Sequence, residues 1–253
     1  MKDFTSDARS FKRQSPRDSE VRRGLIEALF AAPIPREELL NHLVLFQDRR
    51  AISRILFLNE IYQRVIGIHG SIFELGVRYG PNLALFSSLR GIHEPLNANR
   101  KIVGFDTFTG FPDVARGRDA AGAKRGDFAV PNQYEKYLEH VLGLQEAMGP
   151  LENLRRFELV KGDATRTLDA YLKRHPETVI ALAYFDLDLY RPTKECLKRI
   201  LPHLNSGAVV AFDEVNVADF PGETLAFREV LGGGRFTLIH SPFRASAAYL
   251  VYE

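Results

Sequence analysis

Short apolar runs alternate along the chain with segments of helical periodicity. Five runs carry apolar residues at nearly every position: 71–75 (SIFEL), 101–106 (KIVGFD), 156–163 (RFELVKGD), 179–186 (VIALAYFD) and 207–213 (GAVVAFD). Continuous rather than alternating apolar strands are typical of a parallel sheet that is covered on both faces. The pattern therefore predicts a doubly wound α/β fold, in which ligands bind beyond the carboxyl ends of the strands.

The segments between these runs have helical spacing of apolar residues. We expect helices at 81–89, 133–142, 168–174, 193–201 and 223–231, and two closing strands at 235–240 and 246–252. The sheet would then have seven mostly parallel strands in a Rossmann-like arrangement. Two further helices, 21–30 and 36 to about 66, precede it, and Pro35 opens the second. We therefore divide the chain into residues 1–66, a basic tail with a helical cap or oligomerisation segment, and residues 67–253, the main domain.

Composition narrows the class of protein. With 253 residues, 45% of them hydrophobic, the chain has the apolar mass for a large core. No apolar run is long enough to cross a membrane, so we expect a cytoplasmic protein without a membrane partner. One cysteine, Cys196, excludes a disulfide scaffold and a zinc knuckle. A net charge of +2 does not suggest nucleic-acid binding, although residues 1–23 are basic and form either a mobile tail or a flap over an anionic substrate.

An acidic residue lies at or near the end of each of the five core strands. These residues are Glu74, Asp106, Asp163, Asp186 and Asp213. Because the carboxyl ends of parallel strands meet at one edge of the sheet, we expect the acids to surround a common crevice. Any one of them alone would more commonly cap the following helix, but five in register argue against capping as a joint explanation.

The first strand runs into a loop with two glycines, Glu74-Leu75-Gly76-Val77-Arg78-Tyr79-Gly80. Gly76 allows a tight turn and a close approach of a ligand, and Gly80 allows the next helix to pack closely. A dinucleotide fingerprint would need a third glycine. An acid just before the turn also repels a phosphate, so the loop suits a cationic ligand better.

These features resemble class I S-adenosylmethionine-dependent methyltransferases. The resemblance implies that Glu74, Gly76 and Gly80 bind the amino acid end of the cofactor. It also implies that Asp106, with Thr107, binds the ribose hydroxyls, and that Asp163, with Ala164, binds the adenine. Asp186 would lie beside the cofactor as well.

Four carboxylates, two of them among the five above, fall close together after two neighbouring strands: Asp186 and Asp188 in YFDLDLYRPT, and Asp213 and Glu214 in VVAFDEVN. Asp186 and Asp188 share one side if the chain is extended there. Four crowded carboxylates repel one another unless a cation compensates, and a divalent ion such as Mg²⁺ prefers oxygen ligands. The alternative is that these acids cap the helices that begin near Thr193 and Glu223.

Five motifs together resemble the macrocin O-methyltransferase-like (TylF/MycF) family of sugar O-methyltransferases. They are GSIFELGVRYG, KIVGFDTFTGFP, DLDLYRPT, GAVVAFDE and DFPGETLAF, spread over residues 60 to 250. The resemblance implies metal-dependent methylation of a deoxysugar hydroxyl in antibiotic biosynthesis, and self-association as a dimer or larger oligomer. One position departs from the family, because Glu214 stands where the family has a second aspartate.

The resemblance implies a division of labour among the acids. Asp186, Asp213 and Glu214 would hold Mg²⁺, and Asp188 would take the hydroxyl proton as general base. The opposite assignment, with Asp188 on the metal and Asp186 beside the cofactor, stays open. Residues 111–131 are long for a loop and are expected to be a mobile lid.

Two tyrosines are candidates for substrate contact. Tyr134 lies just beyond the lid, and Tyr190 follows the paired acids. Tyr190 would stack on a sugar face or, alternatively, pack against Pro192.

Three other functions compete with sugar methylation. The first is metal-dependent O-methylation of a catechol-like phenol, because vicinal oxygens chelate in the same way. The second is a Rossmann protein that binds NAD or a nucleotide sugar, against which Glu74 and the missing third glycine argue. The third is a non-catalytic module that keeps the fold.

Overall fold

The computed structural model describes residues 15–232 and 236–253. The first fourteen residues of the predicted basic tail, and Arg235 at the start of the predicted strand 235–240, lie outside the described residues.

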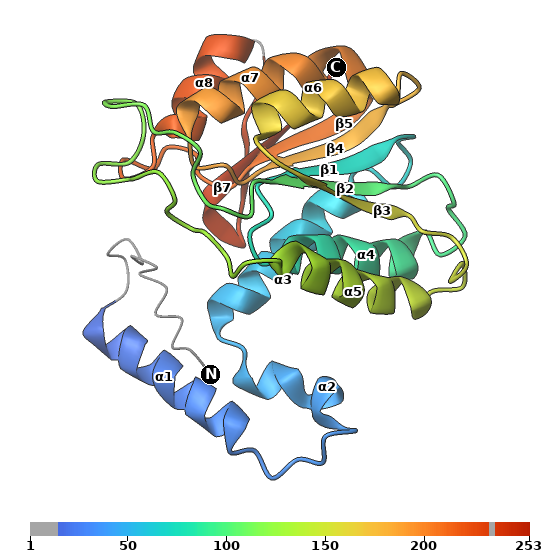
Figure 1. The fold of residues 1–253 in the computed structure, drawn as a ribbon, viewed down its shortest axis with the longest axis vertical. Coiled ribbons are helices and arrows are strands. Elements are labelled where there is room, and N and C mark those ends of the chain that lie inside the picture. Colours follow the sequence, from blue (N-terminus) through green and yellow to red (C-terminus); the bar gives the residue numbers. More distant parts are fainter. Residues whose placement is uncertain (1–14, 233–235) are drawn as a thin grey trace.

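A seven-stranded sheet with the order β3-β2-β1-β4-β5-β7-β6 forms the centre of the molecule (Figure 1). Strands β1 to β5 are parallel to one another, and β7 is antiparallel to both β5 and β6. The predicted doubly wound, mostly parallel sheet is confirmed. The strands are β1 (Ser71–Leu75), β2 (Ile102–Asp106), β3 (Phe157–Lys161), β4 (Ile180–Phe185), β5 (Leu204–Phe212), β6 (Ile239–Ser241) and β7 (Arg244–Val251).

Helices cover both faces of the sheet, which explains the continuous apolar strands. On one face lie α6 (Ala164–Arg174), α7 (Tyr190–Ile200) and α8 (Gly222–Leu231). On the other lie α3 (Arg49–Gln63), α4 (Pro81–His93) and α5 (Tyr134–Ala147). Successive strand residues enter different cores: in β1, Ile72 joins the core beneath α3 to α5, and Phe73 joins the core beneath α6 to α8.

The predicted helix from residue 36 to about 66 is wrong as a single element. The segment consists of α2 (Leu39–His42), the 3-10 helix η1 (Leu43–Phe46) and α3. The predicted helix is interrupted at Asp48. Its side chain accepts hydrogen bonds from the amides of Arg50 and Ala51, so a new helix, α3, begins there. A second 3-10 helix, η2 (Leu201–His203), joins α7 to β5.

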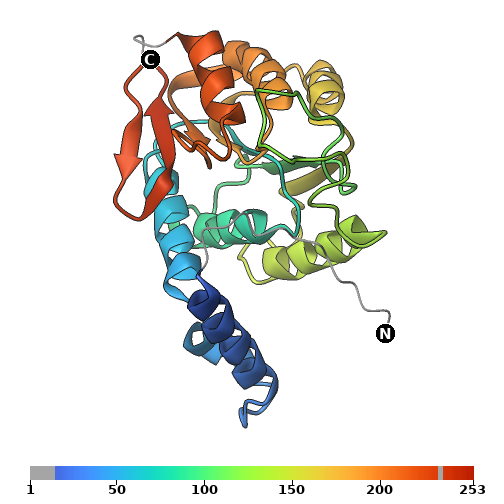
Figure 2. The same cartoon turned by 90° about the vertical axis from the view of Figure 1, so that its left-hand side faces the viewer.

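The N-terminal helices divide into an outlying part and a buried part. Helix α1 (Pro16–Phe30), α2 and η1 contribute no buried residue and extend away from the sheet (Figure 2). Helix α3 instead buries Phe57, Leu58, Ile61 and Tyr62 in the core. The division at residue 66 stays a prediction, but the last helix before it shares the core of the main domain.

Two observations bear on the expectations from composition. The single cysteine, Cys196, is fully buried in α7, and this burial raises the pKa of its thiol above the ordinary value. Among the described residues, no helix combines the length and the apolar character needed to cross a membrane.

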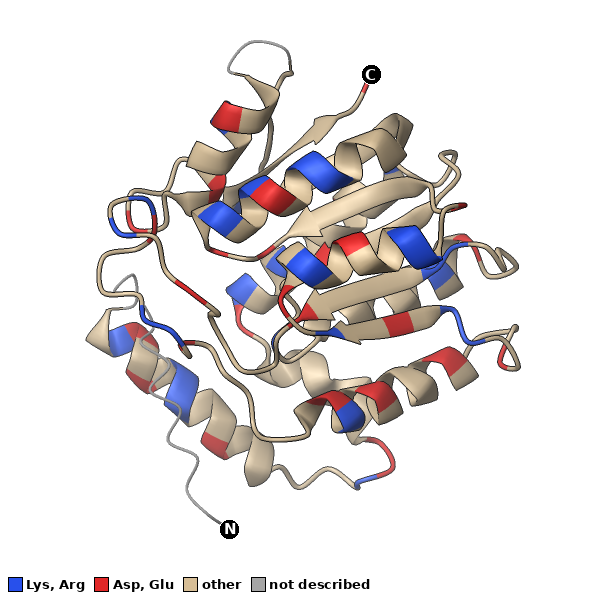
Figure 3. Cartoon of the chain, turned by 45° about the horizontal axis from the view of Figure 1, so that its top comes forward, with Lys and Arg blue, Asp and Glu red and all other residues tan. Residues whose placement is uncertain are grey.

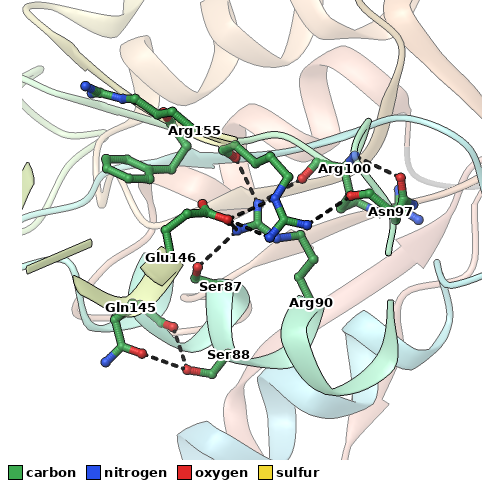
Figure 4. A network of polar contacts seen from close by, with 11 residues as sticks. Ser87, Ser88, Arg90, Asn97, Arg100, Gln145, Glu146 and Arg155 are labelled. Atoms are coloured by element: carbon green, nitrogen blue, oxygen red, sulfur yellow. Dashed lines mark hydrogen bonds and ion pairs between the residues drawn. The ribbon is translucent and has the colours of Figure 1, made fainter. Parts of the chain in front are cut away.

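A buried ionic network joins α4, α5 and the chain before β3 (Figure 4). Arg90 donates two hydrogen bonds of 2.8 and 2.7 Å to the carboxylate of Glu146, and the Arg156 Nε donates to the same carboxylate at 2.9 Å. Arg90 also donates to the carbonyls of Arg100 and Arg156. Arg90, Glu146 and Arg156 are at most 5% exposed, so removal of the Glu146 charge would leave two buried guanidinium groups without a counter-charge.

We predict that Glu146→Gln lowers the free energy of unfolding by about 3–5 kcal/mol, because two buried guanidinium groups lose their counter-charge. Urea unfolding followed by circular dichroism measures the change. Glu139→Gln on the same helix is the matched control, since the Glu139–Arg155 pair is 46% and 56% exposed, and it should change the free energy by less than about 1 kcal/mol. Equal losses in the two variants would contradict the prediction.

Candidate active site

A cavity of about 530 Å³ opens at the carboxyl ends of the parallel strands, where the fold class places ligands. Its volume is in the usual range for small-molecule sites. The loops after β1, β2, β3, β4 and β5 all reach it, and they bring Gly76, Asp106, Asp163, Asp186 and Asp213 to its walls. In Figure 3 acidic residues (red) lie in the loops beyond one end of the central strands. Of the five acids predicted to surround a common crevice, only Glu74 does not line it.

Glu74 lies beneath the cavity instead of on its surface. Its side chain is fully buried, and Oε1 accepts a hydrogen bond of 2.8 Å from Asn82 Nδ2 in α4. Burial is the main cause that raises the pKa of Glu74 well above its ordinary value, and the charges of Asp186 and Asp106 add to it. This placement points to support of the first turn of α4 from below, with Asn82 itself in the cavity wall.

The glycine loop is held by close backbone approaches. Gly76 has a positive φ of 95°, and a Cβ there would lie 1.9 Å from the carbonyl oxygen of Asp186. Gly80 also has a positive φ, and a Cβ there would lie 2.4 Å from the side chain of Leu138. The close packing that requires Gly80 is therefore against Leu138 of α5. Gly76 lines the cavity and Gly80 lies just outside it.

Asp106 anchors the glycine loop to the end of β2. Its Oδ2 accepts from the amides of Val77 at 2.7 Å and Arg78 at 2.8 Å, and its Oδ1 accepts from the amide of Phe108. A carboxylate has about four acceptor positions, so three amide bonds leave room for a further hydroxyl donor. Thr107 shapes the same turn by donating to the carbonyl of Gly110 at 2.7 Å, and it lines the cavity.

Asp163 acts as the N-cap of α6. Its Oδ1 accepts from the amide of Thr165 at 2.9 Å and from the Thr165 hydroxyl at 2.8 Å. The capping alternative is therefore realised at this position, while Asp163 and the neighbouring Ala164 also line the cavity.

Asp186, Asp188, Asp213 and Glu214 come together in one part of the cavity wall, as the sequence predicted. Burial first, and then the charge of Asp213, raise the pKa of Asp186 to about 7. The pKa of Asp188 is raised well above its ordinary value by burial and by the charges of Asp186 and Asp213. Asp188 also has a positive φ of 59°, a conformation that an aspartate tolerates better than most residues.

Two basic residues that the sequence analysis missed face these acids. Arg244 on β7 donates to Asp213 Oδ2 at 2.5 Å, and the hydroxyl of Tyr184 on β4 donates to Asp213 Oδ1. Arg54 reaches the cavity from α3, and its charge opposes the rise in the pKa of Asp186. The spacing of charges along the chain gives no signal for these contacts, because both arginines come from elements far from the acids in sequence.

The cluster has the donor chemistry for a divalent cation, but in this structure its side chains are not arranged to hold one and Asp213 is already paired. Four carboxylates with hard oxygen atoms, two of them with raised pKa values, are a fitting set of donors for Mg²⁺. Both oxygens of Asp213 are engaged, by Tyr184 and Arg244. Within residues 15–232 and 236–253, no three or more histidine, cysteine, aspartate or glutamate side chains are grouped so that they would hold a metal ion.

The loop of residues 111–131 contains no helix or strand and closes one side of the cavity. Asp119, which the sequence analysis did not single out, fastens it: Oδ1 accepts from the amide of Tyr190 at 2.6 Å, and Oδ2 accepts from the amide of Ala115 at 2.6 Å. Arg118 stacks over the ring of Tyr190, with 4.4 Å between its Cζ and the ring centroid. In this structure the loop is thus docked on the start of α7.

The two predicted substrate tyrosines do not line the cavity. The hydroxyl of Tyr190 donates to Glu229 on α8, and its ring is covered by Arg118 and Lys194. Tyr134 donates to the carbonyl of Tyr79 at 3.2 Å. The aromatic residues that line the cavity are Phe105, Tyr79, Phe111, Phe128 and Phe220, which sequence spacing did not distinguish from core residues.

The strand order, the glycine loop and the acids at the strand ends define a class I S-adenosylmethionine-dependent methyltransferase. Residues 73–215 match the model of the family described as "Methyltransferase domain", and the chain belongs to this family. It acts as an S-adenosylmethionine-dependent O-methyltransferase.

Solved structures of one enzyme resemble nearly the whole chain. The crystal structure of CalS11, a calicheamicin methyltransferase, is 45% identical over 97% of this chain and 96% of that chain, with a TM-score of 0.93. The apo structure of CalS11, titled a TDP-rhamnose 3'-O-methyltransferase of calicheamicin biosynthesis, is 41% identical over 97% and 99%, with a TM-score of 0.85. The O-methyltransferase NovP shares the fold at 17% identity, with a TM-score of 0.60 over 92% and 98%. The comparison with curated proteins gave no match.

The raised pKa of Asp186 has a consequence for stability. The native pKa of about 7 lies above the unfolded value of 3.8, so between these two pH values the native state binds more protons than the unfolded state. The stabilising contribution of protonated Asp186 is therefore fully present below about pH 4, and it is lost as the pH rises through about 7. We predict that Asp186→Asn is more stable than the wild type at pH 8 and not at pH 4.

The difference at pH 8 should be at most about 4 kcal/mol, and smaller because the side chain is partly exposed. Urea unfolding at both pH values, with a chelator present, measures it. Asp113→Asn, which removes an 81% exposed carboxylate from the loop 111–131, is the control and should behave alike at both pH values. If Asp186→Asn is less stable than the wild type at pH 8, then the proposed cause, burial of the Asp186 charge beside Asp213, is ruled out.

Proposed function

We propose that this enzyme methylates a hydroxyl of a nucleotide-linked deoxysugar, as a member of the macrocin-type (TylF/MycF) group, in antibiotic or other secondary-metabolite biosynthesis. The similarity to the TDP-rhamnose 3'-O-methyltransferase CalS11, at 41% and 45% identity over 97% of the chain, carries this proposal. A cytoplasmic location is part of it, because activated sugars and S-adenosylmethionine are intracellular metabolites.

The lining of the cavity supports the following assignment of cofactor-binding residues. Gly76 would admit the cofactor close to the backbone, Asp106 would accept a ribose hydroxyl at its remaining acceptor position, and Asp163 and Ala164 would bind the adenine. Glu74 and Gly80 act through the shape of the loop, since neither lines the cavity. When bound, S-adenosylmethionine supplies an electrophilic methyl group.

Asp188 is the proposed general base. A sugar hydroxyl holds its proton too tightly to attack at neutral pH, so a carboxylate with a raised pKa in the cavity wall is well suited to accept that proton. Asp186, Asp213 and Glu214 would hold Mg²⁺, which when bound lowers the pKa of a coordinated hydroxyl and orients its oxygen. For Asp213 this requires exchange of the contact with Arg244. The loop that Asp119 fastens to α7 contributes Phe111, Pro112 and Phe128 to the cavity wall and would shield the reacting atoms from water on that side.

The function is tested by acceptor screening. The protein is incubated with S-adenosylmethionine and either TDP-rhamnose, the free sugar or catechol, with Mg²⁺ or with a chelator, and products are identified by mass spectrometry. Methylated TDP-rhamnose that forms only with Mg²⁺ supports the proposal. Methylated catechol alone would favour the phenol methyltransferase, and cofactor binding in calorimetry without any product would favour a non-catalytic module.

We predict that Asp188→Asn lowers kcat by about 10²–10⁴-fold, because the amide cannot take the hydroxyl proton. Calorimetric affinities for S-adenosylmethionine and Mg²⁺ should stay within about twofold of the wild type. The control Asp169→Asn, at a 46% exposed position on α6, should leave kcat unchanged. Loss of Mg²⁺ binding in Asp188→Asn would assign Asp188 to the metal and support the opposite assignment.

We also propose that the enzyme forms a homo-oligomer through its N-terminal helices. Large apolar side chains are exposed there, among them Phe30 at 86%, Val44 at 68% and Leu45 at 66%. Exposed apolar residues clustered on one segment are typical of interfaces. We predict that the double substitution Phe30→Glu and Val44→Glu shifts the mass in sedimentation equilibrium to that of a monomer, whereas Ile92→Glu, exposed at 70% on α4, does not. A wild type that is already monomeric would refute the oligomer.

A further inference from the structure

One buried glutamate joins the two loops that carry the acidic cluster. Glu223 is the second residue of α8 and has no exposed surface. Its Oε1 accepts hydrogen bonds from the amides of Leu187 at 3.0 Å and Asp188 at 3.2 Å. Its Oε2 accepts from the amide of Glu214 at 3.1 Å. A single carboxylate thus spans from the loop after β4 to the loop after β5.

The start of α8 is fitted closely against the Asp188 segment. A Cβ on Gly222 would lie 2.6 Å from the carbonyl oxygen of Asp188 and 2.6 Å from the amide of Tyr190. A side chain at position 222 would therefore clash with the Asp188 segment, and glycine at this position allows Glu223 to approach the two loops. The contact also fixes Asp188 in its left-handed backbone conformation, which determines where its carboxylate lies.

A further carboxylate at this place is electrostatically unfavourable. Glu223 adds a fifth carboxyl group beside four others, and burial together with the charges of Asp188 and Asp186 raises its pKa well above the ordinary value. An apolar side chain would avoid this repulsion, but it would leave the amides of Leu187, Asp188 and Glu214 without their acceptor. The arrangement favours defined loop geometry over stability.

We propose that Glu223 is a positioning residue for methyl transfer: it sets the distance between the segments of Asp188 and Glu214 and so aims both carboxylates at one point in the cavity. The inference rests on the proposed function, because that function makes Asp188 the base. Glu223 does not line the cavity, so it acts through the two backbone segments.

The test compares Glu223→Gln with Thr224→Val. Glutamine keeps the shape, but its amide nitrogen cannot accept, so one of the two loops is released. Misplacement of reacting groups by about 1 Å lowers rates by about 100-fold, so we expect kcat for the sugar to fall about 10–100-fold. The KM and the calorimetric affinity for S-adenosylmethionine should stay within about twofold.

Thr224 is the matched control, since its hydroxyl accepts from the amide of Asn216 at 2.9 Å and ties the same loop beyond the acids. Thr224→Val should keep kcat within about threefold of the wild type. Wild-type kcat in Glu223→Gln would overturn the inference. A fall in kcat equal to that of Thr224→Val would overturn it as well, because general loosening of the loop would then explain the loss.

Amide hydrogen exchange provides a second readout that does not depend on turnover. The amides of Asp188 and Glu214 should exchange slowly in the wild type and at least tenfold faster in Glu223→Gln. Equal exchange would overturn the inference. If Glu223→Gln does not fold, wild-type protection of these amides that persists in Thr224→Val supports it, and fast wild-type exchange overturns it. Failure of the proposed function is recognised separately, since the wild type would then methylate no sugar.

Discussion

The mutual repulsion of carboxylates at the ends of β4 and β5 is the constraint on which the rest of the site depends. Strand β4 is buried throughout and β5 is buried over its last five residues, between two helical layers, so water screens these groups less than at the protein surface. The protein compensates with charges from remote elements: Arg244 from β7 pairs with Asp213, and Arg54 arrives from α3. The antiparallel end of the sheet and the last N-terminal helix therefore have an electrostatic part in the site as well as a packing part.

Backbone amides are the second means by which the site is held. Asp106 accepts from three amides of the glycine loop and the turn after β2, and Glu223 accepts from three amides of the loops after β4 and β5. Each carboxylate thus fixes loops that have no regular structure of their own. Side chains that bind ligands can then rest on a backbone whose hydrogen bonds are already satisfied.

The sequence was sufficient to predict the sheet and the position of the cavity, because both follow from local patterns. Continuous apolar strands require two covering layers, and acids at strand ends share an edge once the strands are parallel. The hydrogen-bond partner of each predicted site residue could not be predicted from the sequence. Asp163 caps α6, Glu74 lies beneath α4, and Tyr190 turns toward Glu229. These choices depend on which distant residue arrives nearby, and the break at Asp48 depends on one side-chain cap that outweighs helical periodicity.

The burial of Cys196 makes the enzyme convenient for spectroscopy. It is the only thiol of the chain, it is enclosed in α7, and its raised pKa disfavours the reactive thiolate. A cysteine introduced at an exposed position of the loop 111–131 would react with a maleimide dye ahead of the native one. The position of that loop relative to α7 could then be followed with a single fluorophore, without first replacing any native residue.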